Sequence, residues 1–261
     1  MNRLFTGIYL SLLVFNSALA ADAGRKPHIL FLIGEPEYQT RETLTTFADQ
    51  ELIPRGVKCS FALEDPRDTN SFVGLENLKT ADLLFVSVRR HAPLLSQMTM
   101  IRDYVEKGGA VAGIRTASHA FGSKPKDKEH AGWDRFDVDI LGGSYSNHFG
   151  NFTSLVEVAG GALNYPILAG IEGIPFPTQR LYKNTHLAPT AIPLLTSHAE
   201  GETTLQYVAW VNTNSNRRVF YTSLGSPADF EKTPFRKLLI NGIYWAMNET
   251  PSSVSSAKNS K

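Results

Sequence analysis

Short apolar runs recur along the first part of the chain. Residues 28–33 form a near-continuous apolar run that ends in a glycine, and comparable runs follow at 57–62, 83–88 and 110–114. Such runs, apolar on both faces and only five or six residues long, are typical of buried strands in a parallel sheet. The pattern therefore predicts four strands within about ninety residues.

Amphipathic segments separate these strands. Residues 41–53 and 96–107 place apolar side chains at helical spacing and are closed by Pro or Gly, and residues 75–79 predict a short helical turn. Strands that alternate with helices imply right-handed crossovers. The predicted fold class is therefore α/β, with a doubly wound, mostly parallel sheet and helices on both faces.

The later part of the chain has a different texture. Residues 118–150 are rich in Gly, Asp, His and aromatic residues, and only 133–141 predict a helix there. A final amphipathic helix is predicted at 235–247. Between them, we expect short strands that extend the sheet or add an antiparallel flank, at 155–158, 179–182, 192–196, 207–211 and 219–222.

The N-terminus has the pattern of a secretory signal peptide. Arg3 precedes an apolar stretch, and Ala18-Leu19-Ala20 is a small-x-small cleavage signal, which predicts a signal peptide at 1–20. No Cys follows the cleavage site, and no second long apolar run occurs, so we expect a periplasmic or secreted protein without an integral membrane segment. One α/β domain is expected over 27–249, followed by a disordered tail at 250–261.

Charge and cysteine content narrow the function. The formal net charge is +1, and no long basic run is present, so nucleic acid is not an expected partner. The single cysteine, Cys59, cannot form an internal disulfide. Its place in a predicted strand favours a buried thiol over a nucleophile.

The loop after the strand at 110–114 is the first candidate site. In the run 113–119, Arg115 takes the place that a nucleophile would have in an elbow between a strand and a helix. Arginine is not a nucleophile, so Arg115 is expected to anchor a carboxylate, a phosphate or sugar hydroxyls. Thr116 and His119 are further candidates, and the alternative is a loop whose side chains bond to backbone.

Polar residues also follow two other predicted strands. Glu35, Glu37 and Tyr38 come after the first strand, and Arg89-Arg90-His91 comes after the third. Ligands of doubly wound sheets bind beyond the carboxyl ends of the strands. We therefore take Glu35 as a candidate acid, base or orienting group, and Tyr38 and His91 as candidates for substrate binding; solvated loop residues are the alternative.

Two more segments contribute candidates. In the glycine-rich run 142–150, His148 is a candidate general base and Tyr145 a sugar-binding aromatic. After the last predicted strand, Ser223 and Asp229 are candidates for substrate binding. For Asp229 and the nearby Ser226, capping of the following helix is the alternative.

No cofactor is expected. The sequence lacks a dinucleotide-binding glycine motif and the usual spacings of metal ligands. A divalent metal is the alternative, because three histidines from separate loops can form such a site: His119, His148 and His186.

Several of these segments together resemble the ThuA-like (trehalose utilisation) family, which has the class I glutamine amidotransferase-like fold. The resemblance spans nearly the whole chain after the signal peptide. It lies in residues 29–35, 108–121, Trp133 with Phe136, 141–145, His148, and 218–225 leading into 235–247.

The resemblance implies a flavodoxin-like three-layer sandwich and a link to sugar metabolism, in particular to keto-glucosides. Family members often carry His at the elbow and after the last strand, where this chain has Arg115 and Ser226. The elbow also lacks the amidotransferase Cys, so glutaminase chemistry is not expected.

The expected function is therefore binding of, or action on, a small sugar or sugar derivative. As an enzyme, the protein would be a hydrolase, lyase or isomerase in which His148, His119 and Glu35 move protons beside a carbonyl. The alternative is a non-catalytic sugar-binding or scaffold protein that retains the fold.

Overall fold

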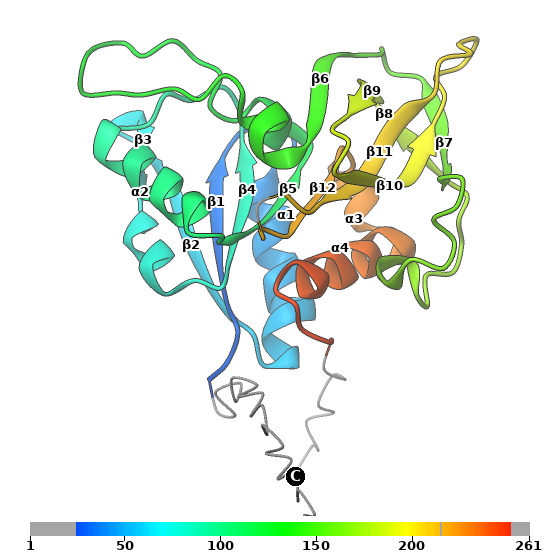
Figure 1. Ribbon diagram of the computed structural model, residues 1–261, viewed down its shortest axis with the longest axis horizontal. Coiled ribbons are helices and arrows are strands. Elements are labelled where there is room, and N and C mark those ends of the chain that lie inside the picture. The colour runs from blue at the N-terminus through cyan, green and yellow to red at the C-terminus, as the bar shows by residue number, and fades with distance from the viewer. Residues whose placement is uncertain (1–24, 215, 252–261) are drawn as a thin grey trace, which may run out of the picture.

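A ten-stranded sheet forms the centre of the computed structural model, which describes residues 25–214 and 216–251 (Figure 1). Its five central strands are parallel to one another and are, in spatial order, β2 (Lys58–Asp65), β1 (His28–Gly34), β4 (Leu83–Val88), β5 (Ala110–Ile114) and β12 (Val219–Thr222). β1, β4 and β12 are buried at every position, as their uninterrupted apolar sequences predict.

Antiparallel strands complete the sheet on both sides. β3 (Asp68–Val73) pairs with β2 at one edge. Beyond β12 the sheet continues through β11 (Gln206–Asn212), β10 (Ala191–Ser197), β7 (Thr153–Val158) and β8 (Phe176–Gln179). β7 alternates buried and exposed residues over most of its length, as expected for a strand with one solvated face. A separate ribbon pairs β6 (Gly143–His148) with β9 (Tyr182–Leu187).

Helical segments cover both faces of the sheet. One face carries α1 (Thr40–Phe47), the π-helical η1 (Ala48–Leu52), the 3-10 turns η2 (Ile53–Arg55) and η6 (Pro166–Leu168), α3 (Pro227–Phe230) and α4 (Thr233–Ala246). The other face carries η3 (Leu75–Thr80), α2 (Leu95–Glu106) and the π-helical η5 (Asp137–Leu141). The result is a three-layer arrangement (Figure 1).

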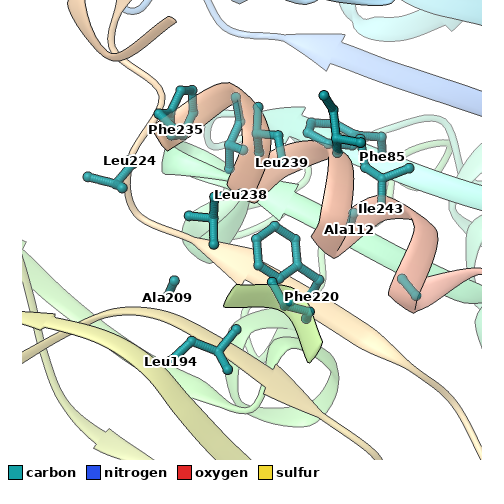
Figure 2. Close-up of a cluster of buried hydrophobic side chains, with 14 of the residues drawn as sticks. Phe85, Ala112, Leu194, Ala209, Phe220, Leu224, Phe235, Leu238, Leu239 and Ile243 are labelled. Atoms are coloured by element: carbon teal, nitrogen blue, oxygen red, sulfur yellow. The ribbon is translucent and has the colours of Figure 1, made fainter. Parts of the chain in front are cut away.

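Each face of the sheet has its own hydrophobic core. On the α4 side, Leu238, Leu239 and Ile243 are buried against Phe220 and Phe85 of the sheet, as Figure 2 shows. Met98, Ile101 and Val105 of α2 belong to the opposite core. Alternate residues of β1 enter the two cores, which is the period-two pattern of a strand with helices on both sides.

The predicted α/β class with a doubly wound sheet is confirmed, and the later strands both extend the sheet and form an antiparallel flank. Three details of the prediction were wrong. The helix expected at 133–141 is only η5, and the helix expected at 41–53 changes from α to π geometry after Phe47. The strand expected at 179–182 is interrupted, because Arg180 has φ 52° and separates β8 from β9.

The expected signal peptide lies outside the described residues, and so does most of the expected tail. Across residues 25–214 and 216–251, no helix is long and apolar enough to cross a membrane.

Candidate functional site

The strand register brings four polar loops to one end of the sheet. Gly34 of β1 pairs with Val88 of β4, and Ile114 of β5 pairs with Thr222 of β12. Because these strands are parallel, the loops that follow them leave the same edge. The β6–β9 ribbon lies at this end as well (Figure 1).

The elbow after β5 is formed as the sequence predicts, and the Arg115 side chain at its apex is buried. Arg115 has φ 45° and a side chain that is only 1 % exposed. Its guanidinium donates hydrogen bonds to the carbonyl oxygens of Arg180 (3.1 Å) and Gln179 (3.2 Å) and lies over the Tyr38 ring, 4.6 Å from its centroid. Arg115 thus connects the elbow to the chain between β8 and β9, and its role in anchoring a ligand stays a prediction.

Asp229 is the buried counterion of Arg115. Its carboxylate is fully buried, 3.7 Å from the guanidinium, and accepts hydrogen bonds from the backbone N–H groups of Gly225 and Ser226 (3.0 Å each). Burial alone would raise the pKa of Asp229, but Arg115, these hydrogen bonds and Lys232 outweigh it and lower the pKa. Asp229 and Ser226 form a capping box at α3, as the capping alternative expects, and the substrate-binding role of Asp229 stays a prediction.

A small polar cleft opens beside the elbow. Its volume is about 190 Å³, and it is lined by Glu37, Tyr38, Arg89, Arg90, His119, Tyr145, Asn147, His148 and Tyr182. These residues come from the loops after β1, β4 and β5 and from both strands of the ribbon. The structure thus brings together four of the predicted site residues: Tyr38, His119, Tyr145 and His148. Three larger cavities, of about 400, 410 and 370 Å³, have different linings.

Aromatic rings form one wall of the cleft. The His119 imidazole stacks on Tyr145 with centroids 4.4 Å apart, and the Tyr145 ring lies 4.7 Å from that of Tyr182. The Tyr182 hydroxyl donates a hydrogen bond to the Tyr38 hydroxyl at 3.4 Å. Arg115 lies behind this wall, 5.4 Å from the centroid of Tyr182. These contacts hold four rings from four segments in place.

Hydrogen bonding defines the tautomer of the neutral form of one cleft histidine, and burial and nearby charges set the pKa of the other. Nδ1 of His148 lies 2.7 Å from the carbonyl oxygen of Phe149, which can only accept, so in the neutral imidazole Nδ1 carries the proton and the lone pair is on Nε2. In His119, Nδ1 lies 3.1 Å from Oγ of Ser118. Burial, followed by the charges of Arg90 and Arg89, lowers the pKa of His119 to about 3. His119 is therefore neutral near pH 7, and Nε2 of His148 has no hydrogen-bond partner among the described residues.

Charged groups define the opposite side. Glu37 binds Nε of Arg89 at 3.0 Å and Nη1 of Arg180 at 3.3 Å. The neighbouring Arg90 has φ 54°, and its backbone N–H donates to the carbonyl of His119 at 2.9 Å. Positive charge therefore exceeds negative charge around the cleft.

Glu35 does not belong to the cleft. It is 4 % exposed, and its carboxylate accepts hydrogen bonds from the backbone N–H groups of Tyr38 (2.8 Å) and Thr40 (3.1 Å) and from the Thr40 hydroxyl. Burial raises the pKa of Glu35 against the effect of these bonds. Its carboxylate thus shapes the loop that carries Glu37 and Tyr38, and a catalytic role of Glu35 stays a prediction.

Three further predicted residues face other parts of the molecule. His91 is buried near β2, where its Nε2 lies 2.7 Å from Oε1 of Glu64. The Ser223 hydroxyl donates to the carbonyl of Val208 in β11 at 3.3 Å. Thr116 is completely buried, and its hydroxyl has no hydrogen-bond partner within the described part of the chain. None of the three lines the cleft, and their role in substrate binding stays a prediction.

The three-histidine metal site is not formed. His186 is exposed near the opposite end of the ribbon from His148, and its Nδ1 contacts the Thr185 hydroxyl at 2.8 Å. Over residues 25–214 and 216–251, no group of three or more His, Cys, Asp or Glu side chains is placed to hold a metal ion.

Some cleft residues were not chosen from the sequence. Glu37, Arg89 and Arg90 lie in loops that the strand-end rule had selected, so their position was the available signal. Tyr182 and Asn147 had no such signal, because the β6–β9 ribbon was not predicted.

Cys59 is a partly buried free thiol in β2 whose burial raises its pKa to about 12, so it is not a nucleophile here.

The parallel core, the elbow and the absence of Cys at its apex define an α/β fold of the class I glutamine amidotransferase-like type without its nucleophile. One similar structure is that of PurLQS from Thermotoga maritima, with a TM-score of 0.50 at 12 % identity over 85 % of this chain and 99 % of that one. Within this class, the chain belongs to the ThuA family, described as trehalose utilisation, which matches residues 34–246.

Solved ThuA-like structures share the fold. A ThuA-like protein from Bacteroides uniformis ATCC 8492 is 18 % identical, with a TM-score of 0.62 over 88 % of this chain and 94 % of that one. A second, from Parabacteroides merdae ATCC 43184, is 14 % identical, with a TM-score of 0.55 over 89 % and 94 %. No curated protein sequence matches the chain.

Proposed function

We propose that the protein binds a sugar or sugar derivative in the cleft and acts on it by proton transfer beside a carbonyl. The observation that carries this proposal is the juxtaposition of His148, with its free Nε2, and the neutral His119 stacked on Tyr145. Membership of a family described as trehalose utilisation supports a carbohydrate as the ligand. Stacked rings and polar side chains are suited to the alternating apolar and hydroxyl faces of a sugar.

His148 is the proposed base. A carbonyl acidifies the neighbouring C–H bond, so Nε2 of His148 would take that proton while the electron pair moves to the carbonyl oxygen as an enolate. Arg90 or Arg89 would stabilise the oxyanion, and return of the proton from His148 to carbon restores the carbonyl and the free base. His119 has too low a pKa to hold a proton near neutral pH, so its proposed role is to accept a hydrogen bond from a hydroxyl group.

Exchange of carbon-bound protons gives the sharpest test. NMR of a keto-glucoside in D₂O should show protein-dependent loss of the proton beside the carbonyl, even without net turnover. His148→Gln should slow this exchange by about 10²–10⁴-fold, the usual contribution of a positioned base. His186→Gln, an exposed histidine on the same ribbon, is the matched control and should exchange like the original protein. Equal rates for all three proteins would refute the proposed role of His148.

A non-catalytic sugar-binding protein is the second candidate. The observation in its favour is that Arg115 occupies the elbow apex and is engaged internally, so no nucleophile is available there. This candidate predicts a calorimetric binding signal that depends on Tyr145 and His148, with no proton exchange at any pH. The same two measurements therefore separate the two functions.

Export is part of the proposal. The charged and apolar N-terminal pattern with its Ala18-Leu19-Ala20 signal favours a periplasmic or secreted protein. N-terminal sequencing of the protein recovered from the producing cells should begin at Ala21. An N-terminus at Met1 would show that the segment is retained.

A further inference from the structure

The charges around the cleft do not balance. Three guanidinium groups, those of Arg89, Arg90 and Arg180, lie at or beside it, and Glu37 is the only carboxylate in its lining. Arg89 and Arg180 share the two oxygens of Glu37. Within residues 25–214 and 216–251, no carboxylate lies within ion-pair distance of Arg90.

The backbone of Arg90 is fixed at the rim of the cleft. Its N–H donates to the carbonyl of His119 at 2.9 Å, and its own carbonyl accepts a hydrogen bond from the Ser123 hydroxyl. The left-handed conformation, φ 54°, turns the chain between the buried end of β4 and the buried His91. The guanidinium therefore extends from a well-held main chain into the rim, with its five donors unpaired by any carboxylate.

The surroundings respond to this positive charge. Arg90 and Arg89 are, after burial, the main groups that lower the pKa of His119. Arg90 also opposes the rise that burial causes in the pKa of Tyr145. A neutral glycoside would leave the excess charge uncompensated, whereas an anion would neutralise it and would find in arginine a planar fork that matches its oxygens.

The size of the cleft limits the ligand. About 190 Å³ is below the few hundred Å³ of a pocket for a drug-sized ligand, so it holds about one sugar ring. We propose that the ligand is an anionic monosaccharide, an inference that rests on the proposed carbohydrate function. Its carboxylate or phosphate group binds Arg90 while its ring lies against Tyr145 and His119. Arg89 stays paired with Glu37 and borders the site.

Calorimetric titration of the purified full chain with glucose, glucuronate, glucose 6-phosphate and inorganic phosphate tests this inference. At least one sugar anion should bind about tenfold or more tightly than glucose, a factor typical of one charge-assisted hydrogen-bonded pair. The tighter of the two sugar anions identifies the group as carboxylate or phosphate. The advantage should shrink at high salt, because the site is partly exposed.

Variants of Arg90 separate the contribution of its positive charge to binding from that of its planar guanidinium group. Arg90→Gln should remove the advantage over glucose, and Arg90→Lys should retain part of it, because the charge remains but the fork is lost. Arg135→Gln is the matched control, since Arg135 is a surface arginine that pairs with Asp139 and does not line the cleft. Thermal denaturation of each variant checks that it is folded.

The outcomes distinguish the proposal of an anionic ligand from the proposed carbohydrate function. Equal affinities for glucose and both sugar anions, unchanged in Arg90→Gln, would overturn the anionic ligand and leave carbohydrate binding intact. Phosphate binding as tight as glucose 6-phosphate would also overturn it, because the ring would then contribute nothing. If neither neutral nor anionic sugars bind the folded protein, the proposed function itself fails.

Discussion

His119 and Tyr145 stack with ring centroids 4.4 Å apart and an angle of 22° between their planes, which joins the elbow after β5 to the β6–β9 ribbon. Removal of the phenol in Tyr145→Ala should weaken sugar binding and lower the free energy of unfolding by about 0.5–1.5 kcal/mol beyond the lost buried area. Tyr145→Phe keeps the stack and should be close to the original protein in a urea titration. Equal losses in the two variants would mean that the hydroxyl, and not the stack, matters.

The low pKa of His119 makes folding sensitive to acid. The folded-state pKa of about 3 lies below the ordinary value of 6.5. As pH falls through 6.5, His119 becomes protonated in the unfolded chain but stays neutral in the folded protein. The free energy of unfolding should therefore decrease from about pH 6.5 down to about pH 3.

His119→Asn removes this titration while keeping a polar side chain. Urea titrations at several pH values should show a shallower loss of stability toward acid in the variant than in the original protein. His186→Asn, a change at an exposed histidine, serves as control and should keep the full slope. A slope that is the same in the His119 variant would show that folding does not lower the pKa of this imidazole.

The sheet and the position of the site follow from the sequence for a clear reason. Residues 28–34 and 83–88 are apolar at nearly every position, so both faces of these strands must be covered, and that requires helices on both sides. Parallel strands then place their loops at one edge, which is why Tyr38 and His119 could be predicted to lie near each other.

The choice within each loop was less predictable. Glu35 was preferred to its neighbour Glu37, but Glu35 turns inward because it accepts hydrogen bonds from the backbone of its own loop. His91 was preferred to Arg90, but the left-handed turn at Arg90 directs the histidine toward Glu64. A residue's neighbour in sequence can face the other way when local hydrogen bonds bend the chain, and these bonds depend on tertiary contacts that periodicity does not encode.

The ribbon was missed for a different reason. β6 reads Gly-Ser-Tyr-Ser-Asn-His, which has no β-branched residue and no apolar alternation, so propensity gives no strand signal. Its pairing with β9 is made by tertiary contacts, including close packing of Gly143 against Trp210. Two cleft residues, Asn147 and Tyr182, were hidden for the same reason.

The buried pair of Arg115 and Asp229 should dominate the stability of the elbow. Asp229→Ala leaves the guanidinium buried without a counterion and removes the cap of α3, so the free energy of unfolding should fall by about 3–5 kcal/mol. Arg115→Met removes the charge while roughly keeping the volume, and the double variant should be more stable than Asp229→Ala alone. Guanidinium titrations of the three variants measure this coupling; simple additivity would show that the two side chains act independently.

The last prediction concerns a residue outside the cleft that sets the position of its wall. A Cβ atom on Gly143 would lie 2.2 Å from Cζ2 of Trp210, whose indole is held by a 2.7 Å hydrogen bond to the carbonyl of Leu141. Gly143→Ala must therefore displace the start of β6, two residues before Tyr145. We expect a loss of about 1–3 kcal/mol in the free energy of unfolding, the usual cost of overpacking, together with weaker sugar binding. Gly160→Ala is the matched control, since a Cβ there meets no atom within 4 Å, and it should leave both quantities unchanged. Stability and affinity are measured by urea titration and calorimetry; a Gly143 variant that loses stability but binds sugar normally would show that the ribbon does not position the Tyr145 ring.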